Sequence, residues 1–162
     1  MEKIIRTTPD NGDFRYLVNQ LDCDLAIRDG KDHSFYAQFN KSTGINHALV
    51  AYADGTPAGI GALRPYNADT VEIKRMFVIP QYRGLGVAIL ILAELEAWAR
   101  ELNFKSCILE TGKKQPEAIG LYNKSGYQRI PNFGPYINID NSVCMKKEIV
   151  LPVKMHLMSS TS

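Results

Sequence analysis

The chain has 162 residues, which fits one domain and is long enough to bury a sizeable core. Apolar residues make up 45% and charged residues 22%, which are ordinary values for a soluble globular protein. The formal charge of +2 is too close to neutral to indicate a nucleic-acid partner, and the sequence contains no basic run.

Three cysteines, Cys23, Cys107 and Cys144, form no close pair, so the sequence predicts no disulfide framework. The amino terminus lacks the apolar core of a signal peptide, and the most apolar run, residues 87–93, is too short to span a bilayer. We therefore expect a cytoplasmic protein with no membrane partner. The histidines have no metal-ligand spacing, and we expect no metal.

The first half of the chain is predicted to contain strands and one long helix. In order, we expect a strand at 3–6, a helix capped by Asn11 or Asp13 and ended by Asp29-Gly30, one or two helical turns at 33–39, and strands at 48–53 and 58–63. Asp54-Gly55, between the last two strands, indicates a hairpin because both residues tolerate positive φ.

The second half alternates strands and helices. We expect a strand at 70–79 that Pro80 stops, a helix at 84–102, a strand at 106–110, a helix from Pro116 to about Lys124 ended by Gly126, and strands at 127–130 and 142–149. The sequence thus predicts one α/β domain, residues 1–150. The tail, 151–162, is predicted to be partly disordered or to dock on the domain or on a second subunit.

Residues 81–86, which read Gln-Tyr-Arg-Gly-Leu-Gly, join a predicted strand to the long helix. The first amides of a helix lack partners and its dipole adds positive charge, so this geometry favours an anion. The glycines allow a phosphate to approach the backbone, and Arg83 adds full charge. A plain strand–helix turn is the structural alternative. A dinucleotide fingerprint is excluded because Ile89 stands where its third glycine belongs.

Two motifs resemble those of the GNAT superfamily of N-acetyltransferases. Gln81-x-x-Gly84-x-Gly86 resembles the family's Gln/Arg-x-x-Gly-x-Gly/Ala motif, and the block from Gln115 to Tyr127 resembles its Asn-x-x-Ala-x-x-x-Tyr-x-x-x-Gly-Phe signature, with Gln115 in place of the commoner Asn. The resemblance covers residues 3–149. It implies a splayed, mostly antiparallel sheet of six to seven strands flanked by about four helices, with acetyl-CoA as cosubstrate.

The resemblance also implies a set of coenzyme-binding residues. Backbone groups at Met76, Phe77 and Val78 would pair with pantetheine, and the amides from Arg83 to Ala88 would hold the pyrophosphate. Tyr122 would lie near the thioester and Lys124 near the distal phosphates. The implied binding residues are Met76, Phe77, Val78, Gln81, Arg83, Gly84, Leu85, Gly86, Val87, Ala88, Gln115, Tyr122 and Lys124.

Acetyl transfer to an amine requires removal of a proton from the amine, donors to the oxyanion and a proton for the departing thiolate. Glu72 is the predicted base; its structural alternative is an ion pair with Lys74, two positions on along the same strand face. Tyr122 is the predicted acid, with a packed aromatic as the alternative. In the family, an amide near Phe77 or Val78 is the usual oxyanion donor.

The sequence also predicts residues that contact the acceptor. Tyr136 in its proline-flanked loop, with His33 and Tyr36 nearer the amino terminus, are the predicted substrate contacts, because both regions border the acceptor cleft in the family. We expect an N-acetyltransferase of a small-molecule primary amine. A protein or peptide N-acetyltransferase and a non-catalytic acyl-CoA-binding module are the alternatives, and a homodimer is compatible with the apolar tail.

Overall fold

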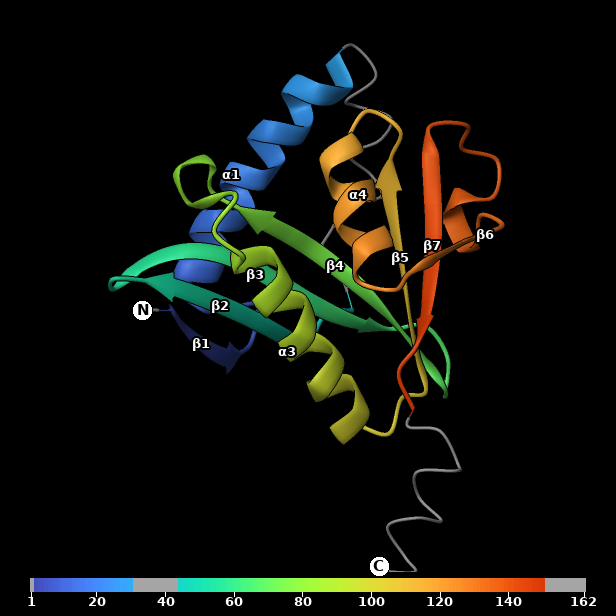
Figure 1. Ribbon diagram of the computed structural model, residues 1–162, viewed down its shortest axis with the longest axis horizontal. Helices are drawn as coiled ribbons and strands as arrows, with labels where there is room; N and C mark the ends of the chain where they lie inside the picture. Colours follow the sequence, from blue (N-terminus) through green and yellow to red (C-terminus); the bar gives the residue numbers. More distant parts are fainter. Residues whose placement is uncertain (1, 31–43, 151–162) are drawn as a thin grey trace, which may run out of the picture.

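The structure is a computed structural model that describes residues 2–30 and 44–150, a seven-stranded sheet with helices on both faces (Figure 1). The predicted helical turns at 33–39 and the tail at 151–162 lie outside the described residues. In chain order the elements are β1 (Glu2–Thr7), α1 (Gly12–Asp29), β2 (His47–Ala53), β3 (Thr56–Pro65), β4 (Thr70–Val78), α3 (Val87–Glu101), β5 (Ser106–Gly112), α4 (Pro116–Lys124), β6 (Gln128–Ile130) and β7 (Ser142–Glu148).

The strand order in the sheet is β1-β2-β3-β4-β5-β7-β6, and only the β4–β5 pair is parallel. The mostly antiparallel sheet implied by the family resemblance is therefore confirmed. The described residues contain three α-helices, where about four were expected. The hairpin at Asp54-Gly55 is also confirmed, since both residues have positive φ (51° and 80°) between β2 and β3.

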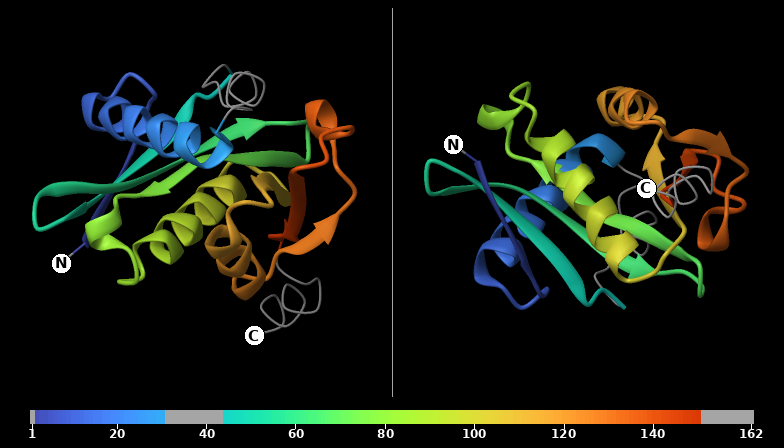
Figure 2. Two further views of the ribbon diagram at one scale, coloured as in Figure 1. Left: turned by 90° about the horizontal axis from the view of Figure 1, so that it is seen from above. Right: turned by 60° about the horizontal axis from the view of Figure 1, so that its bottom comes forward.

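Two apolar cores lie on opposite faces of the sheet. Figure 2 shows α1 on one face and α3 with α4 on the other. The spacing of Phe14, Leu17 and Leu21 buries one side of α1 against β2, β3 and β4, as the sequence predicted. The side chain of Asn11 accepts a hydrogen bond from the Phe14 amide at 3.0 Å, so Asn11 is the amino-terminal cap of this helix.

Strands β4 and β5 are paired over only part of their length. Thr70–Glu72 lies beside Ser106–Ile108, and beyond these residues the two strands diverge toward α4 (Figure 1). A bulge in the β3–β4 pairing follows between Lys74 and Phe77, where Arg75 adopts a φ of 58°. Bulges bend the strand that contains them, so the divergence has a local cause. The splayed sheet implied by the resemblance is confirmed.

Helix α3 begins at Val87, three residues later than predicted. Gly84 and Gly86 have φ values of 80° and 83°, which belong to the left-handed region and not to a right-handed helix. The chain leaves β4 at Val78 and makes one tight turn, Pro80–Tyr82, before these glycines. The loop therefore reverses direction with its backbone exposed, directly before the first turn of α3.

Candidate active site

A groove with a cavity of about 390 Å³ runs along the open edge of β4, between the loop at 81–86, the start of α3 and helix α4. Of the predicted coenzyme-binding residues, those that line this groove are Met76, Phe77, Val78, Arg83, Gly84, Gly86, Val87, Ala88, Gln115 and Tyr122. Gln81, Leu85 and Lys124 are not among its lining residues. Segments far apart in the sequence thus meet along one groove, most of them as the motifs predicted.

The loop and the start of α3 have the geometry of an anion site. The first amide with an acceptor inside the helix is that of Leu90, which donates to the Gly86 carbonyl at 3.1 Å. The amides before it point out of the helix end, where the dipole favours negative charge. A Cβ at Gly84 or Gly86 would meet no atom within 4 Å, so space for a phosphate is present beside the backbone.

Arg83 lies along the open edge of β4. Its Nε donates to the Val78 carbonyl at 2.7 Å, and its guanidinium lies 5.5 Å from the centre of the Phe77 ring. The Ile79 amide donates to Ala58 in β3, and amides alternate in direction along a strand, so the Val78 backbone faces away from β3. Arg83 thus donates a hydrogen bond to a backbone carbonyl that faces the groove.

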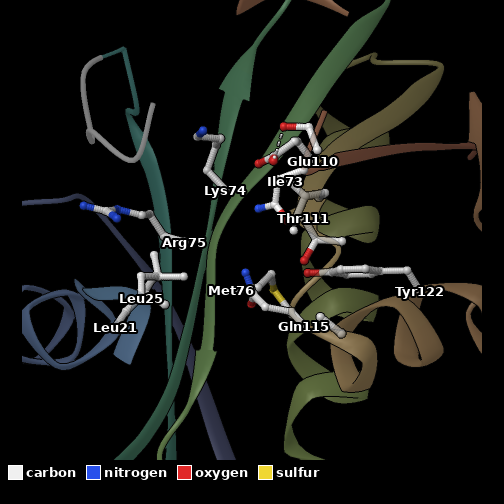
Figure 3. A pocket seen from close by; sticks show the side chains of 14 residues that line it. Leu21, Leu25, Ile73, Lys74, Arg75, Met76, Glu110, Thr111, Gln115 and Tyr122 are labelled. Carbon is white, nitrogen blue, oxygen red and sulfur yellow. Dashed lines mark hydrogen bonds between the residues drawn. The ribbon is translucent and has the colours of Figure 1, made fainter. Parts of the chain in front are cut away.

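A second cavity, of about 120 Å³, lies where β4 and β5 separate (Figure 3). It shares Leu21, Met76, Gln115, Ala118 and Tyr122 with the groove, so the two hollows adjoin at α4. Its other lining residues are mostly polar or charged, and they include Lys74, Arg75, Glu110, Thr111, Asn141 and Ser142. Tyr122 lines both hollows and marks their junction.

Tyr122, the predicted acid, is buried and projects from α4 toward the split between the strands (Figure 3). Burial raises the pKa of its hydroxyl, and the negative charge of Glu110 raises it further. The hydroxyl is therefore protonated at neutral pH, as a proton donor must be. The ring also packs edge-on against Tyr127, with the two centroids 5.8 Å apart. The expected alternative, a packed aromatic, therefore applies to the ring of Tyr122, and its hydroxyl faces the split between the strands.

Glu72, the predicted base, is buried beside Lys74. The Lys74 ammonium lies 3.5 Å from its carboxylate, so the ion pair expected as the structural alternative is present. The Tyr136 hydroxyl donates to the same carboxylate at 3.1 Å, and Lys74 donates to that hydroxyl at 3.0 Å. Glu72 lines neither the groove nor the second cavity. Its role as base stays a prediction.

Tyr136, the predicted substrate contact, is buried, with 2% of its surface exposed. Burial and the charge of Glu72 raise the pKa of its hydroxyl, with a further contribution from Glu110. Tyr136 is not among the lining residues of either hollow. It contacts Lys74, which lines the second cavity. His33 and Tyr36 lie outside the described residues, so all three substrate contacts stay predictions.

Glu110 was not singled out from the sequence. It is half-buried on β5, lines the second cavity and accepts a hydrogen bond from the Ser142 hydroxyl at 2.7 Å. Its charge contributes to the raised pKa of the hydroxyls of both Tyr122 and Tyr136. The sequence did carry a signal: Glu110 is the one charged residue of the strand Ser106–Gly112.

The family is shown by comparison with known proteins. A model described as the acetyltransferase (GNAT) family matches residues 15–127. The chain belongs to this family. An IAA acetyltransferase of Azospirillum brasilense is 38% identical over 105 residues, which are 62% of this chain and 67% of that protein. An uncharacterized N-acetyltransferase of Escherichia coli is 27% identical over 88% of this chain and 92% of its own.

Solved structures agree with this GNAT assignment. A candidate acyl-CoA N-acyltransferase from Klebsiella pneumoniae is 31% identical, with a TM-score of 0.78 over 93% of this chain and 99% of its own. A GNAT acetyltransferase from Elizabethkingia anophelis with acetyl-CoA bound shares the fold at 18% identity, with a TM-score of 0.66 over 91% of this chain and 97% of its own.

This GNAT protein is an acetyltransferase that uses acetyl-CoA as cosubstrate. The open edge of β4, the amides at the start of α3 and the space at Gly84 and Gly86 fit that molecule. Within residues 2–30 and 44–150, no three acidic, histidine or cysteine side chains are grouped so that they could hold a metal ion. No described helix is long and apolar enough to cross a membrane.

Proposed function

We propose that this GNAT enzyme transfers the acetyl group of acetyl-CoA to the primary amine of a small molecule, by direct attack of the amine on the thioester. The observation that carries the proposal is the second cavity, which adjoins the coenzyme groove at Tyr122 and measures about 120 Å³. A cavity of roughly 150 Å³ holds a molecule the size of benzene. A small acceptor suits this space.

In this proposal the chain binds acetyl-CoA largely through its backbone. Pantetheine lies along the edge of Met76, Phe77 and Val78, and the amides from Arg83 to Ala88 hold the pyrophosphate. Gln115 lies beside the pantetheine arm at the start of α4, and Lys124 serves the distal phosphates from the other end of this helix. Arg83 leaves the Val78 carbonyl for a phosphate, since that carbonyl is the acceptor an amide of pantetheine would need.

Glu110 and Tyr122 then move the protons. The amine nitrogen bonds to the acetyl carbon and the C–S bond breaks; Glu110 takes a proton from the nitrogen, and the Tyr122 hydroxyl gives one to the sulfur. The Val78 amide, which faces away from β3, is one of the two predicted donors to the carbonyl oxygen. Glu110 is preferred to Glu72 because Glu110 lines the cavity and Glu72 does not.

One relative supports a small acceptor. Human N-acetylaspartate synthetase is 28% identical over 108 residues, which are 66% of this chain but only 36% of that protein. Its name describes an acetylated amino acid as product. The predicted cytoplasmic location and the possible homodimer stay part of the proposal, and cell fractionation and sedimentation would test them.

The experiment is a thiol-release assay with purified protein, acetyl-CoA and a panel of small amines beside lysine-containing and amino-terminal peptides. We expect thiol release with small amines and an acetylated product at the matching mass. Acetylation of the peptides alone would replace the proposal with its protein-modifying alternative. Acetyl-CoA binding by calorimetry, without turnover on any acceptor, would contradict it outright.

A further inference from the structure

The second cavity has a charge pattern of its own. Three side chains that carry charge at neutral pH, Lys74, Arg75 and Glu110, are among its lining residues. Two cations and one carboxylate complement a ligand that contains both an ammonium and an anionic group.

Both cations are oriented by carboxylates that do not line the cavity. Glu72 lies 3.5 Å from the Lys74 ammonium, and Asp22 on α1 lies 2.9 Å from the Arg75 guanidinium. The side chains of Lys74 and Arg75 are 8% and 6% exposed, so their burial depends on such partners. These pairs fix the two cations in position before a ligand arrives, which lowers the entropic cost of binding.

The charges follow an order along the cavity, starting from the junction with the coenzyme groove. Tyr122 marks that junction, and Glu110 acts on both Tyr122 and Tyr136 through its charge. Tyr136 in turn accepts a hydrogen bond from Lys74. Figure 3 agrees: Glu110 lies on the β5 side of the split, the same side as Tyr122, and Lys74 projects from β4. From the thioester outward, the cavity presents a carboxylate first and then a cation.

We propose that the acceptor is a small amino acid, whose amine meets Glu110 next to the thioester and whose carboxylate binds Lys74. This inference rests on the proposed function and names its substrate class. It disfavours diamines and aminoglycosides as acceptors, because their second ammonium would meet Lys74. A small amine without the carboxylate fills the cavity and makes no contact with Lys74.

The test compares acceptors that differ only in the anionic group. A set of small amino acids is assayed beside the corresponding carboxamides and decarboxylated amines, and kcat/KM is corrected for the unprotonated fraction of each amine. Loss of a charge-assisted hydrogen bond predicts that the acids exceed their carboxamides by about 10- to 100-fold. Equal values for acids and carboxamides, or preference for diamines, would overturn the inference and leave the acetyltransferase proposal standing.

A lysine variant assigns the effect to its residue. In Lys74→Met the acid-to-carboxamide ratio should fall toward one, whereas Lys105→Met, which removes an exposed lysine paired with Asp69, should keep the parent ratio. Because the ratio is measured within one protein, partial unfolding of the variant does not change it. An unchanged ratio in Lys74→Met contradicts the role of this residue. If that variant does not fold, the acceptor comparison in the parent protein still decides. Absence of thiol release with every amine would instead refute the proposed function.

Discussion

The coenzyme groove and the second cavity adjoin at Tyr122 and share five lining residues, yet each is completed by a different part of the chain. The groove is formed by the edge of β4 and by a loop whose two glycines expose backbone amides. The second cavity also has lining residues on β5 and at Asn141 and Ser142, where β7 begins, and its charged lining residues are Lys74, Arg75 and Glu110. In the function proposed above, donor recognition therefore depends mainly on main-chain geometry, and acceptor recognition depends on individual side chains.

This division predicts that cavity variants change turnover and that groove variants change coenzyme affinity. The largest effect is expected at Glu110. Glu110→Gln removes the proposed base and should lower kcat by about 10²- to 10⁴-fold, the usual contribution of general base catalysis, with an unchanged Kd for CoA. Steady-state kinetics and calorimetry would measure both. Glu72→Gln is the matched control, and a larger loss in that variant would restore Glu72 as the base.

Tyr122→Phe removes the hydroxyl at the junction and keeps the ring against Tyr127. We expect kcat to fall by about 10- to 100-fold, because the thiolate then leaves without a proton from the protein. The Kd for CoA should be the same in the variant and the parent enzyme. An acetyl thioester with a more acidic thiol should lose much less activity in the variant, since its thiolate does not need the proton.

A control for this variant is Tyr127→Phe, whose parent hydroxyl donates to Glu96 at 2.9 Å, away from both hollows. Its kcat should match that of the parent enzyme. Equal losses of activity with both thioesters in Tyr122→Phe would remove this hydroxyl from the chemical step.

Arg83→Gln tests the groove with ligands of different charge. CoA should bind about tenfold more weakly, because the variant loses a charge-assisted contact to phosphate. Pantetheine, which has no phosphate, should bind the variant at least as tightly as the parent, since the Val78 carbonyl is released. Calorimetry with both ligands measures the two effects, and KM for the acceptor should not change. Parallel weakening of both ligands would contradict the role assigned to Arg83.

The smallest effect lies in the core, outside both hollows. Burial, aided by the charge of Glu96, raises the pKa of the Cys107 thiol to about 12. The unfolded thiol ionises near pH 8.5, so the folded state holds the proton that the unfolded state releases. The contribution of Cys107 to the free energy of unfolding is fully present below about pH 8.5. Above that pH it falls by at most about 1.4 kcal/mol per pH unit. Urea titrations at pH 8 to 10 should show this slope.

The matched variants for that slope are Cys107→Ala and Cys23→Ala, the latter at an exposed position. The free energy of unfolding should decline less steeply with pH in Cys107→Ala than in the parent protein. The exposed variant should keep the parent slope. Identical slopes in all three proteins would mean that Cys107 is ionised equally in the folded and unfolded states.

Local patterns predicted most of the fold. Strand and helix periods, the Asp54-Gly55 turn and the Asn11 cap depend on neighbouring residues only, so one sequence contained enough information for them. The predicted start of α3 was three residues too early, because periodicity does not show that Gly84 and Gly86 adopt left-handed conformations. The groove was also predictable, since a glycine loop before a helix works through its own backbone.

The second cavity could not be predicted from local sequence patterns as the groove could. Its charged residues are 36 positions apart along the chain, from Lys74 to Glu110, and they meet only because β4 and β5 pair at one end and separate at the other. Glu72, the predicted base, pairs with Ile108 in the same register, and Tyr136, the predicted substrate contact, comes from the loop before β7 and is buried against Glu72 and Lys74.

The sequence alone therefore determined the family, the fold and the coenzyme: these depend on short motifs, 81–86 and 115–127, whose backbone conformation is largely local. The tertiary structure decided which carboxylate lines the cavity and which lies behind its wall. The physical reason is that the direction of a strand side chain follows from alternation, but what it faces depends on the partner strand and on where the pairing ends.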